Sequence, residues 1–404
     1  MNKESITPAC VKDTKKDKYV RPNGYIETLK ACKYDKIPKE KCLKYYQENS
    51  EKLRRNACDL FHSNKNKEIL KNRTVKVIED VVVDPRIHMF NNISTSLGKI
   101  SKQQCLNPKN MDINVKEIDI KKTFGTKSAY GMAFLANVNY YDKKDTDQEM
   151  VAVKIMPYNS KNLTELKILD KATDIILDGK TIHFPILYKT LECPVKFKTR
   201  MNEEFLPELL KKQEYFMVIN ELAKGDLKMF LNDKTRVQNT DLMRNTISQI
   251  YLSIAMFHQM IGMNHLDAHW GNFLYHEVNP GGVFHYKIGG KDVYIPNMGY
   301  MWVIWDFGFA KDIENNNLLF KDYIRISHAF LPTSRSGWLP NNRGIDPDFV
   351  EEVLDMVIPM LDKTIKMNDL NVIRSMLKNI HPNVKKTKNL QIVNEGKPMV
   401  ISKD

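Results

Sequence analysis

The sequence has little of what places a protein in a membrane or in an oxidising compartment. Its longest apolar stretch, Tyr251 to Met263, is broken by His258 and Gln259 and is too short to span a bilayer. The lysine-rich start has no apolar core, so no secretory signal is visible. Six cysteines form no close pair, which predicts reduced thiols and argues against a zinc site or a disulfide framework. We therefore expect an intracellular protein with no membrane span.

Internal repeats and low-complexity tracts are also missing, and 42% hydrophobic and 27% charged residues exclude a disordered chain. The 404 residues suit two or three average domains or one large bilobal domain. The net charge of +13 is concentrated at one end, because residues 1–80 contribute +8. We call residues 1–80 the basic arm. It fits an acidic protein, nucleic acid or anionic lipid as partner, or it is a solvated arm without a ligand.

Hydrophobic periodicity and charge predict how the chain is organised. We expect residues 1–115 to be a basic, partly helical N-terminal extension wrapped on the remainder of the chain. Alternating apolar residues predict an antiparallel sheet within 117–157, and 3.6-residue spacing predicts helices over 162–177 and 241–260. Later elements are a hairpin at 283–296 turning at two glycines, helices after 345 and an extended basic tail over 380–404.

The strongest chemical signal is a pair of short motifs in the second half of the chain. The first is His265-Leu-Asp-Ala-His-Trp-Gly-Asn272, and the second is Trp305-Asp-Phe-Gly308. Phosphoryl transfer needs a carboxylate that orients the attacking hydroxyl and hard oxygen ligands that hold Mg²⁺ on the phosphates. Asp267 supplies the base, and Asn272 and Asp306 supply the ligands.

A lysine closes the apolar run Val151-Ala-Val-Lys154. A lysine that faces a phosphate site needs an acidic partner to fix its position. Glu165, eleven residues later on the predicted helix, is the proposed partner; the alternative is an exposed glutamate.

Small residues precede this strand, at Gly125, Ser128 and Gly131. They would let backbone N–H groups approach phosphates. The pattern departs from GxGxxG because a serine stands at the middle position, and the alternative is an ordinary hairpin.

Together these residues resemble the eukaryotic-type protein kinase superfamily over about 118–360. The resemblance implies an α+β, bilobal fold with a small antiparallel β lobe (116–222) and a larger helical lobe (223–379), with ATP and Mg²⁺ as cofactors. It also implies that Ile219 is the gatekeeper and that the Asn220 carbonyl and the Leu222 amide meet the adenine. The further nucleotide-binding positions that it implies are Ala133, Ala152, Lys154 and Leu274.

Within the superfamily the run His-Trp-Gly-Asn is similar to haspin-type kinases and to kinase-like proteins of large DNA viruses. By that resemblance Asp322, in Phe320–Arg325, would be a buried aspartate bracing the catalytic loop, and His265 would support the loop; the alternative for Asp322 is an exposed helix residue. Abundant Lys, Asn and Ile suit an AT-rich viral genome, which suggests the host cytoplasm or a virus particle.

Several positions depart from the superfamily pattern. Leu266 replaces the usual arginine, so we expect activity without activation-loop phosphorylation. His269 replaces the lysine that usually contacts the transferring phosphate, and it either takes that catalytic role or bonds the loop structurally. Trp305 is bulky for a position lining the nucleotide site. The inserted hairpin at 283–296 either binds a partner or decorates the lobe.

These observations favour an active serine/threonine protein kinase whose protein substrate is unknown. A small-molecule phosphotransferase is a weaker reading, because only 96 residues follow Gly308. A nucleotide-binding pseudokinase or virion scaffold is the alternative from another class. The intact metal ligands argue against it, and the irregular glycine loop favours it.

Overall fold

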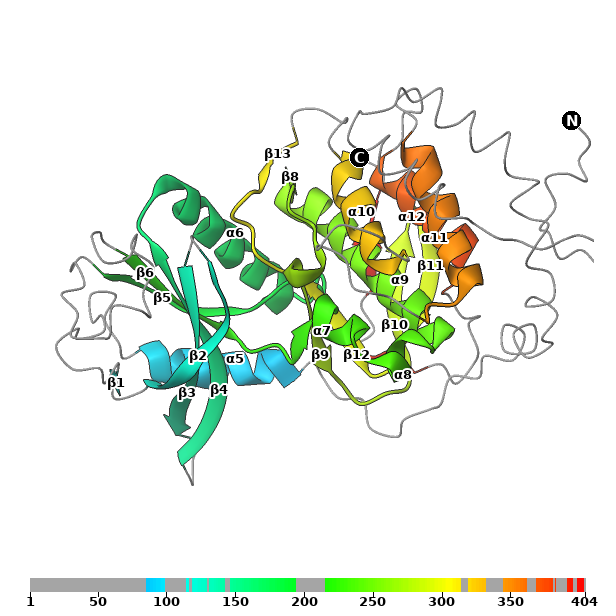
Figure 1. Ribbon diagram of the computed structural model, residues 1–404. Helices are drawn as coiled ribbons and strands as arrows, with labels where there is room; N and C mark the ends of the chain where they lie inside the picture. The colour runs from blue at the N-terminus through cyan, green and yellow to red at the C-terminus, as the bar shows by residue number, and fades with distance from the viewer. Residues whose placement is uncertain are drawn as a thin grey trace, which may run out of the picture.

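The computed structural model describes residues 85–98, 114–115, 118–128, 131–141, 146–193, 215–313, 319–331, 344–361, 368–380, 382, 391–394 and 398–402. The basic arm lies outside these residues. The described part is an α+β fold with antiparallel sheets, as the sequence predicts (Figure 1). Within it, no helix combines the length and the apolarity that crossing a membrane requires.

The first part of the molecule is a six-stranded sheet in the order β1-β2-β3-β4-β6-β5. Its strands are Asn114–Val115, Ile118–Ser128, Gly131–Tyr141, Thr146–Pro157, Leu187–Cys193 (β5) and Tyr215–Glu221 (β6). Along β4, Val151, Val153 and Ile155 are fully buried, whereas Ala152 and Lys154 are partly exposed. Since successive side chains point to opposite faces, Lys154 and Ala152 share one face of the sheet.

Helix α5 (Pro85–Gly98) covers the face opposite Lys154. It packs on β3 and β5, and its Ile93 and Leu97 are completely buried. The Lys189 ammonium of β5 donates to the Leu97 carbonyl. Residues 85–98, which lie inside the predicted N-terminal extension, thus pack on the sheet, although the sequence patterns did not identify this helix. Its asparagines and β-branched residues are weak helix formers, so packing decides its conformation.

Helix α6 (Ser160–Leu177) covers the face that carries Lys154. Asn159 caps its first turn by accepting from the Asn162 backbone N–H, and its buried stripe includes Leu166, Leu169 and Ile176, as the spacing predicts. This helix therefore brings Glu165 to the sheet face on which Lys154 lies.

The second part is mainly helical and is built around α9 (Thr240–Met256), which continues into a π-turn over Phe257–Ile261. Nearly every side chain of α9 is buried, because other elements surround it. The other helices of this part are α7 (Leu227–Leu231), α8 (Lys234–Val237), α10 (Leu319–Ser327), α11 (Pro347–Met360) and α12 (Asp369–Ile380) (Figure 1).

Two small sheets position the motif residues of this part. Strands β9 (Phe273–Glu277) and β12 (Tyr300–Ile304) pair antiparallel, with β7 (Gly225–Asp226) beside β9. The strands β8 (Met263–Asn264) and β13 (Lys311–Asp312) also pair. Since Phe273 pairs with Ile304, the residue before β9 and the residues after β12 are held together.

The predicted hairpin is present as β10 (Val283–Ile288) and β11 (Lys291–Pro296), turning at Gly289 and Gly290. It is part of the core: Tyr286 is fully buried, and its hydroxyl lies 2.8 Å from Nε2 of His183. Strand β14 (Met399–Ile401) pairs parallel with β10. The end of the predicted extended tail is therefore built into the second part, which does not stop at residue 379.

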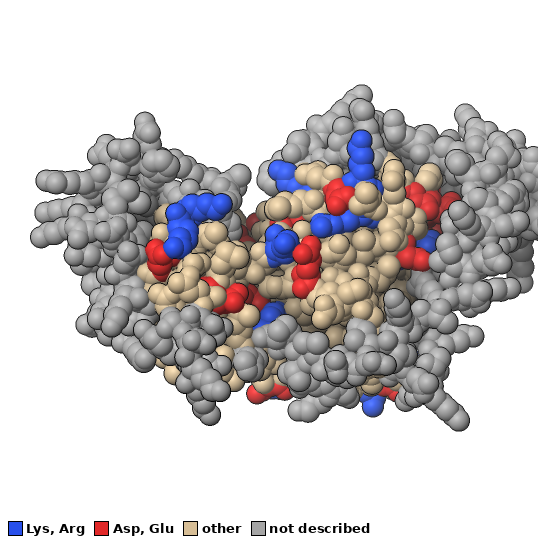
Figure 2. All heavy atoms as spheres, turned by 90° about the horizontal axis from the view of Figure 1, so that it is seen from below, with Lys and Arg blue, Asp and Glu red and all other residues tan. Residues whose placement is uncertain are grey.

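One face of the described residues carries both signs of charge (Figure 2). On the face shown in Figure 2, basic and acidic side chains are interspersed, and no broad area of one sign is seen on the residues that are coloured there. A single-sign surface of the kind that binds nucleic acid is thus not visible on this face.

Candidate functional site

Asp322 of α10 fixes the backbone of the loop between β8 and β9 through hydrogen bonds. This carboxylate is fully buried, and it accepts from the backbone N–H groups of His265 (2.7 Å) and Leu266 (2.8 Å). Leu266 and Asp306 are the two non-glycine residues of the described chain with positive φ, at 60° and 62°. Such a backbone conformation is costly for residues with a Cβ, and it persists only where the surroundings fix it. Asp322 supplies that restraint at Leu266.

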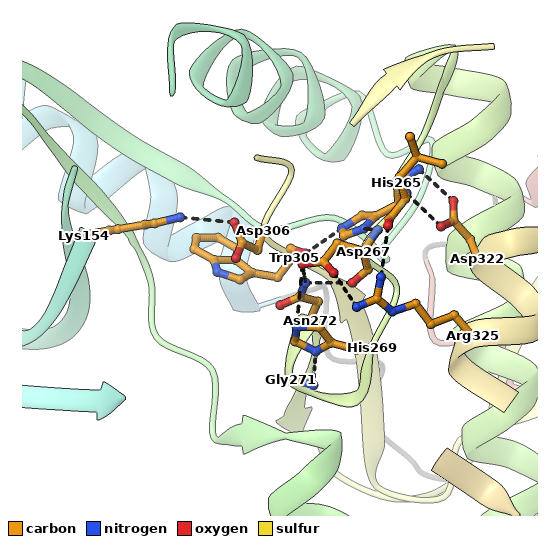
Figure 3. Close-up of polar contacts among 11 residues, drawn as sticks. Lys154, His265, Asp267, His269, Gly271, Asn272, Trp305, Asp306, Asp322 and Arg325 are labelled. Carbon is orange, nitrogen blue, oxygen red and sulfur yellow. Dashed lines mark hydrogen bonds and ion pairs between the residues drawn. The ribbon is translucent and has the colours of Figure 1, made fainter. Parts of the chain in front are cut away.

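His265 joins the two motifs (Figure 3). Its Nδ1 accepts from the Asp267 backbone N–H at 3.3 Å, so the ring proton is on Nε2, which donates to the Trp305 carbonyl at 2.8 Å. The loop that carries Asp267 is thereby tied to the residue before Asp306.

Asp267 lies at the centre of the site, partly buried, with partners on both carboxylate oxygens (Figure 3). Its Oδ1 is 2.7 Å from Nη2 of Arg325, and its Oδ2 accepts from Nδ2 of Asn272 at 3.3 Å. The Nε2 atom of His269 is 3.7 Å from Oδ2. A carboxylate fixed in this way can orient an incoming hydroxyl and accept its proton.

Asn272 and Asp306 have the donor chemistry of a Mg²⁺ site. The Asn272 amide nitrogen also donates to the Asp267 main-chain oxygen at 2.9 Å, so the amide is oriented with its oxygen away from Asp267. The Trp305 N–H donates to the Asn272 carbonyl at 2.8 Å, which holds the two segments together. Among the described residues no group of three or more His, Cys, Asp or Glu side chains could hold a metal. Two protein oxygens plus phosphate oxygens are nevertheless a usual Mg²⁺ environment.

Lys154 connects the sheet to the second part (Figure 3). Its Nζ lies 2.6 Å from Oε1 of Glu165 and 3.4 Å from Oδ1 of Asp306. Burial disfavours the ammonium charge, but the two carboxylates outweigh it and raise the pKa of Lys154. Burial likewise acts against the Asp306 charge, and Lys154 outweighs it, so the pKa of Asp306 is lowered. At neutral pH Lys154 is therefore an ammonium and Asp306 is a carboxylate.

His269 is a neutral imidazole in this arrangement. Its Nδ1 accepts from the Gly271 backbone N–H at 3.0 Å, and an imidazolium has no free nitrogen lone pair with which to do so. Burial and the neighbouring Arg325 lower the pKa of His269, whereas Asp267 opposes the shift. Of the two roles open from the sequence, the observed contact is the structural one.

The nucleotide-binding positions expected from the resemblance are mostly on one face of the sheet. Ala133, Ala152 and Lys154 share it, since Ala133 pairs with Lys154 and all three are partly exposed. Leu222 and Leu274, beyond the sheet, are also partly exposed.

Ile219, the gatekeeper expected from the resemblance, lies on the opposite face of the sheet from Lys154. It pairs with Val153 and is therefore on the face covered by α5, whereas Asn220 pairs with Ala152 and takes the face of Lys154. Both side chains are fully buried. Val218, which pairs with Lys154, shares the face of Asn220, because a shift of one residue exchanges the faces of a strand.

The small residues Gly125, Ser128 and Gly131 lie in the hairpin of β2 and β3. Ser128 pairs with Gly131, and the register shifts between Phe124 and Ser128. The strand is therefore irregular where phosphate contacts were expected, and the side chains of this turn lie outside the described set.

Two residues of the site were missed from the sequence, Arg325 and His258. Arg325 is three positions after Asp322, and this spacing on one helix face was an available signal. His258 is buried between two carboxylates: Nε2 is 3.1 Å from Asp322 and Nδ1 is 2.8 Å from Asp369. Burial opposes its charge, but the two aspartates outweigh burial and raise the pKa of His258 to about 9.

Comparison with known proteins adds no family to this picture, since no protein-family model and no curated protein matches the chain. Functional inference therefore rests on the motifs and on the geometry of the residues that carry them.

Proposed function

We propose that the protein is an ATP-dependent serine/threonine protein kinase with a bilobal fold. The observation that carries the proposal is the meeting of Lys154, from the sheet, with Asp306, from the second part, beside the loop of Asp267 (Figure 3). Five residues with the chemistry that phosphoryl transfer needs are thus brought together from two segments more than 100 residues apart. They are Lys154, Glu165, Asp267, Asn272 and Asp306.

The roles follow from the contacts. Lys154, held by Glu165, would bind the α- and β-phosphates of ATP. Asn272 and Asp306 would hold Mg²⁺, which neutralises charge on the phosphates. The acceptor hydroxyl oxygen forms a bond to the γ-phosphorus, the bond from that phosphorus to the β-phosphate oxygen breaks, and ADP leaves. The hydroxyl proton goes to Asp267 Oδ2.

The ion pairs at the site support an active enzyme rather than a scaffold without activity. Asp306 and Asp267 are held as partly buried carboxylates by Lys154 and Arg325, an arrangement that a fold does not need for stability, because buried ion pairs contribute little net free energy. The hairpin at 283–296, whose role was open, is supported as a packing element by the burial of Tyr286.

The test is transfer of labelled γ-phosphate from ATP and Mg²⁺ onto the protein itself and onto histone, beside Asp267→Asn. We expect label with the intact protein and a loss of at least about 1,000-fold in the variant, because the base is removed. A Mg²⁺-dependent rise in melting temperature with ATP, without transfer, would instead identify a nucleotide-binding scaffold.

A further inference from the structure

The loop that carries Asp267 has no positive charge of its own. Residues 265–272 include no lysine or arginine, and His269 is held as a neutral imidazole by the Gly271 N–H. In phosphoryl transfer the hydroxyl approaches a group with several negative charges, and fixed cations beside it lower the barrier. In Figure 3, Lys154 lies on the side of Asp306 that is away from Asp267. A cation beside Asp267, where the acceptor hydroxyl would bind, therefore has to come from another element.

Helix α10 supplies a cation beside Asp267, which is Arg325. Its Nη2 lies 2.7 Å from Oδ1 of Asp267, and its Nη1 donates to the Leu266 carbonyl at 3.2 Å. The Arg325 side chain as a whole keeps 33% of its surface exposed. Asp322, one helical turn earlier, anchors the same helix to the backbone of the loop.

We propose that Arg325 is the catalytic cation of this site, contacting the transferring phosphoryl group while it fixes the carboxylate of Asp267. The inference rests on the proposed function. A planar guanidinium can donate to a carboxylate and to a phosphate at the same time, which an imidazole in the position of His269 cannot.

The interaction of Arg325 with the phosphoryl group becomes stronger during the reaction. In the ground state Arg325 and Asp267 neutralise each other. When Asp267 takes the hydroxyl proton it loses its charge, and the full guanidinium charge then acts on the phosphoryl group. An interaction that strengthens only in the transition state changes kcat and leaves ATP binding nearly unchanged.

A purely structural Arg325 would behave differently, and Arg244 shows how. Its guanidinium is paired with Glu352 at 2.5 and 2.8 Å and with Asp241 at 3.4 Å. Arg244 and Asp241 lie near the start of α9, Glu352 lies on α11, which packs against α9, and none of the three belongs to the motifs. Arg244→Gln is therefore the matched control: it removes a paired arginine and should lower stability while leaving kcat unchanged.

The experiment measures kcat, the KM for ATP and the melting temperature of the intact protein, Arg325→Gln, Arg325→Lys and Arg244→Gln, all assayed well below melting. We expect Arg325→Gln to reduce kcat by about 100-fold or more, with the KM for ATP changed less than about threefold. Arg325→Lys, which keeps the charge but not the fork, should recover about tenfold of that loss.

Two results would overturn the proposal, and they are distinguishable. If the intact protein transfers phosphate and Arg325→Gln retains its kcat, or loses activity only in proportion to unfolded protein, Arg325 is a structural residue and the kinase assignment stands. If the intact protein transfers no phosphate, the proposed function itself fails, and this inference fails with it.

Discussion

At the scale of single residues, ion pairs fix the side chains of the site. Lys154 is paired with Glu165, which is 3% exposed, and removing the ammonium leaves that carboxylate buried without its nearest cation. The same lysine contacts Asp306. Its loss should therefore affect stability and catalysis separately, and the two effects can be measured apart.

Lys154→Met is expected to abolish phosphate transfer and to lower the free energy of unfolding by about 3 kcal/mol, the usual effect of breaking a buried pair. Adding Glu165→Gln should restore most of that stability but no transfer. Urea denaturation and labelled-phosphate transfer on the single and double variants give the two readouts. Recovery of transfer in the double variant would show that Lys154 acts only as a structural partner.

His258 makes a prediction about pH. Its pKa is about 9 in the fold and about 6.5 in an unfolded chain. The stability contributed by its charge is fully present below pH 6.5 and is lost as the pH rises through 9, by about 3 kcal/mol. The groups that face it are Asp322, Asp369 and Tyr323, whose hydroxyl donates to Asp369.

Denaturation of the intact protein and of His258→Gln between pH 6 and 9.5 tests this. The intact protein should lose stability across that range, and the variant should be less stable at pH 6 with a flatter profile. Parallel profiles for the two proteins would contradict the assignment of a charged His258.

At the scale of elements, helix α5 makes a buried ion pair in addition to its apolar packing on the sheet. Arg86 lies 3.3 Å from Glu221 Oε1 and also donates to the carbonyls of Phe184 (3.2 Å) and Ile182 (3.0 Å). Glu221 ends β6, where the chain passes from the sheet to the second part. The helix thus stabilises the segment that connects the two parts.

Arg86→Ala should lower the free energy of unfolding by about 3 kcal/mol, because the buried Glu221 carboxylate loses its arginine and keeps only weaker partners such as the Ile186 N–H. Lys180→Ala is the control: Lys180 pairs with Asp178 on the surface, at 2.7 Å, and its loss should cost about 0.5 kcal/mol or less. Equal losses in urea denaturation would mean that α5 is not held by Arg86.

The elements also show which features the sequence could predict. The hairpin of β10 and β11 follows from alternation and two glycines, and the motif residues of the site follow from their chemistry, since both signals are local. Helix α5 and the faces of Ile219 and Asn220 could not be predicted in that way. They depend on packing and on strand register, and one step of register moves a side chain across the sheet. Arg325 lay within a recognised segment, but only its contact with Asp267 gives it a role.

At the scale of the whole molecule, a sheet that carries Lys154 faces a helical part that carries Asp267, Asn272 and Asp306 (Figure 1). Two contacts join the two parts: Lys154 with Asp306, and the Ile304 N–H with the His183 carbonyl. The central claim is that ATP and an acceptor hydroxyl react there.

The most direct measurement is incorporation of phosphate from γ-labelled and α-labelled ATP by the intact protein and by Asp306→Ala, followed by identification of the modified amino acid. The account predicts label on serine or threonine from γ-labelled ATP alone, and loss of at least about 100-fold in Asp306→Ala because a metal ligand and the partner of Lys154 are removed. Equal label from the intact protein and Asp306→Ala, or none from either, would contradict it.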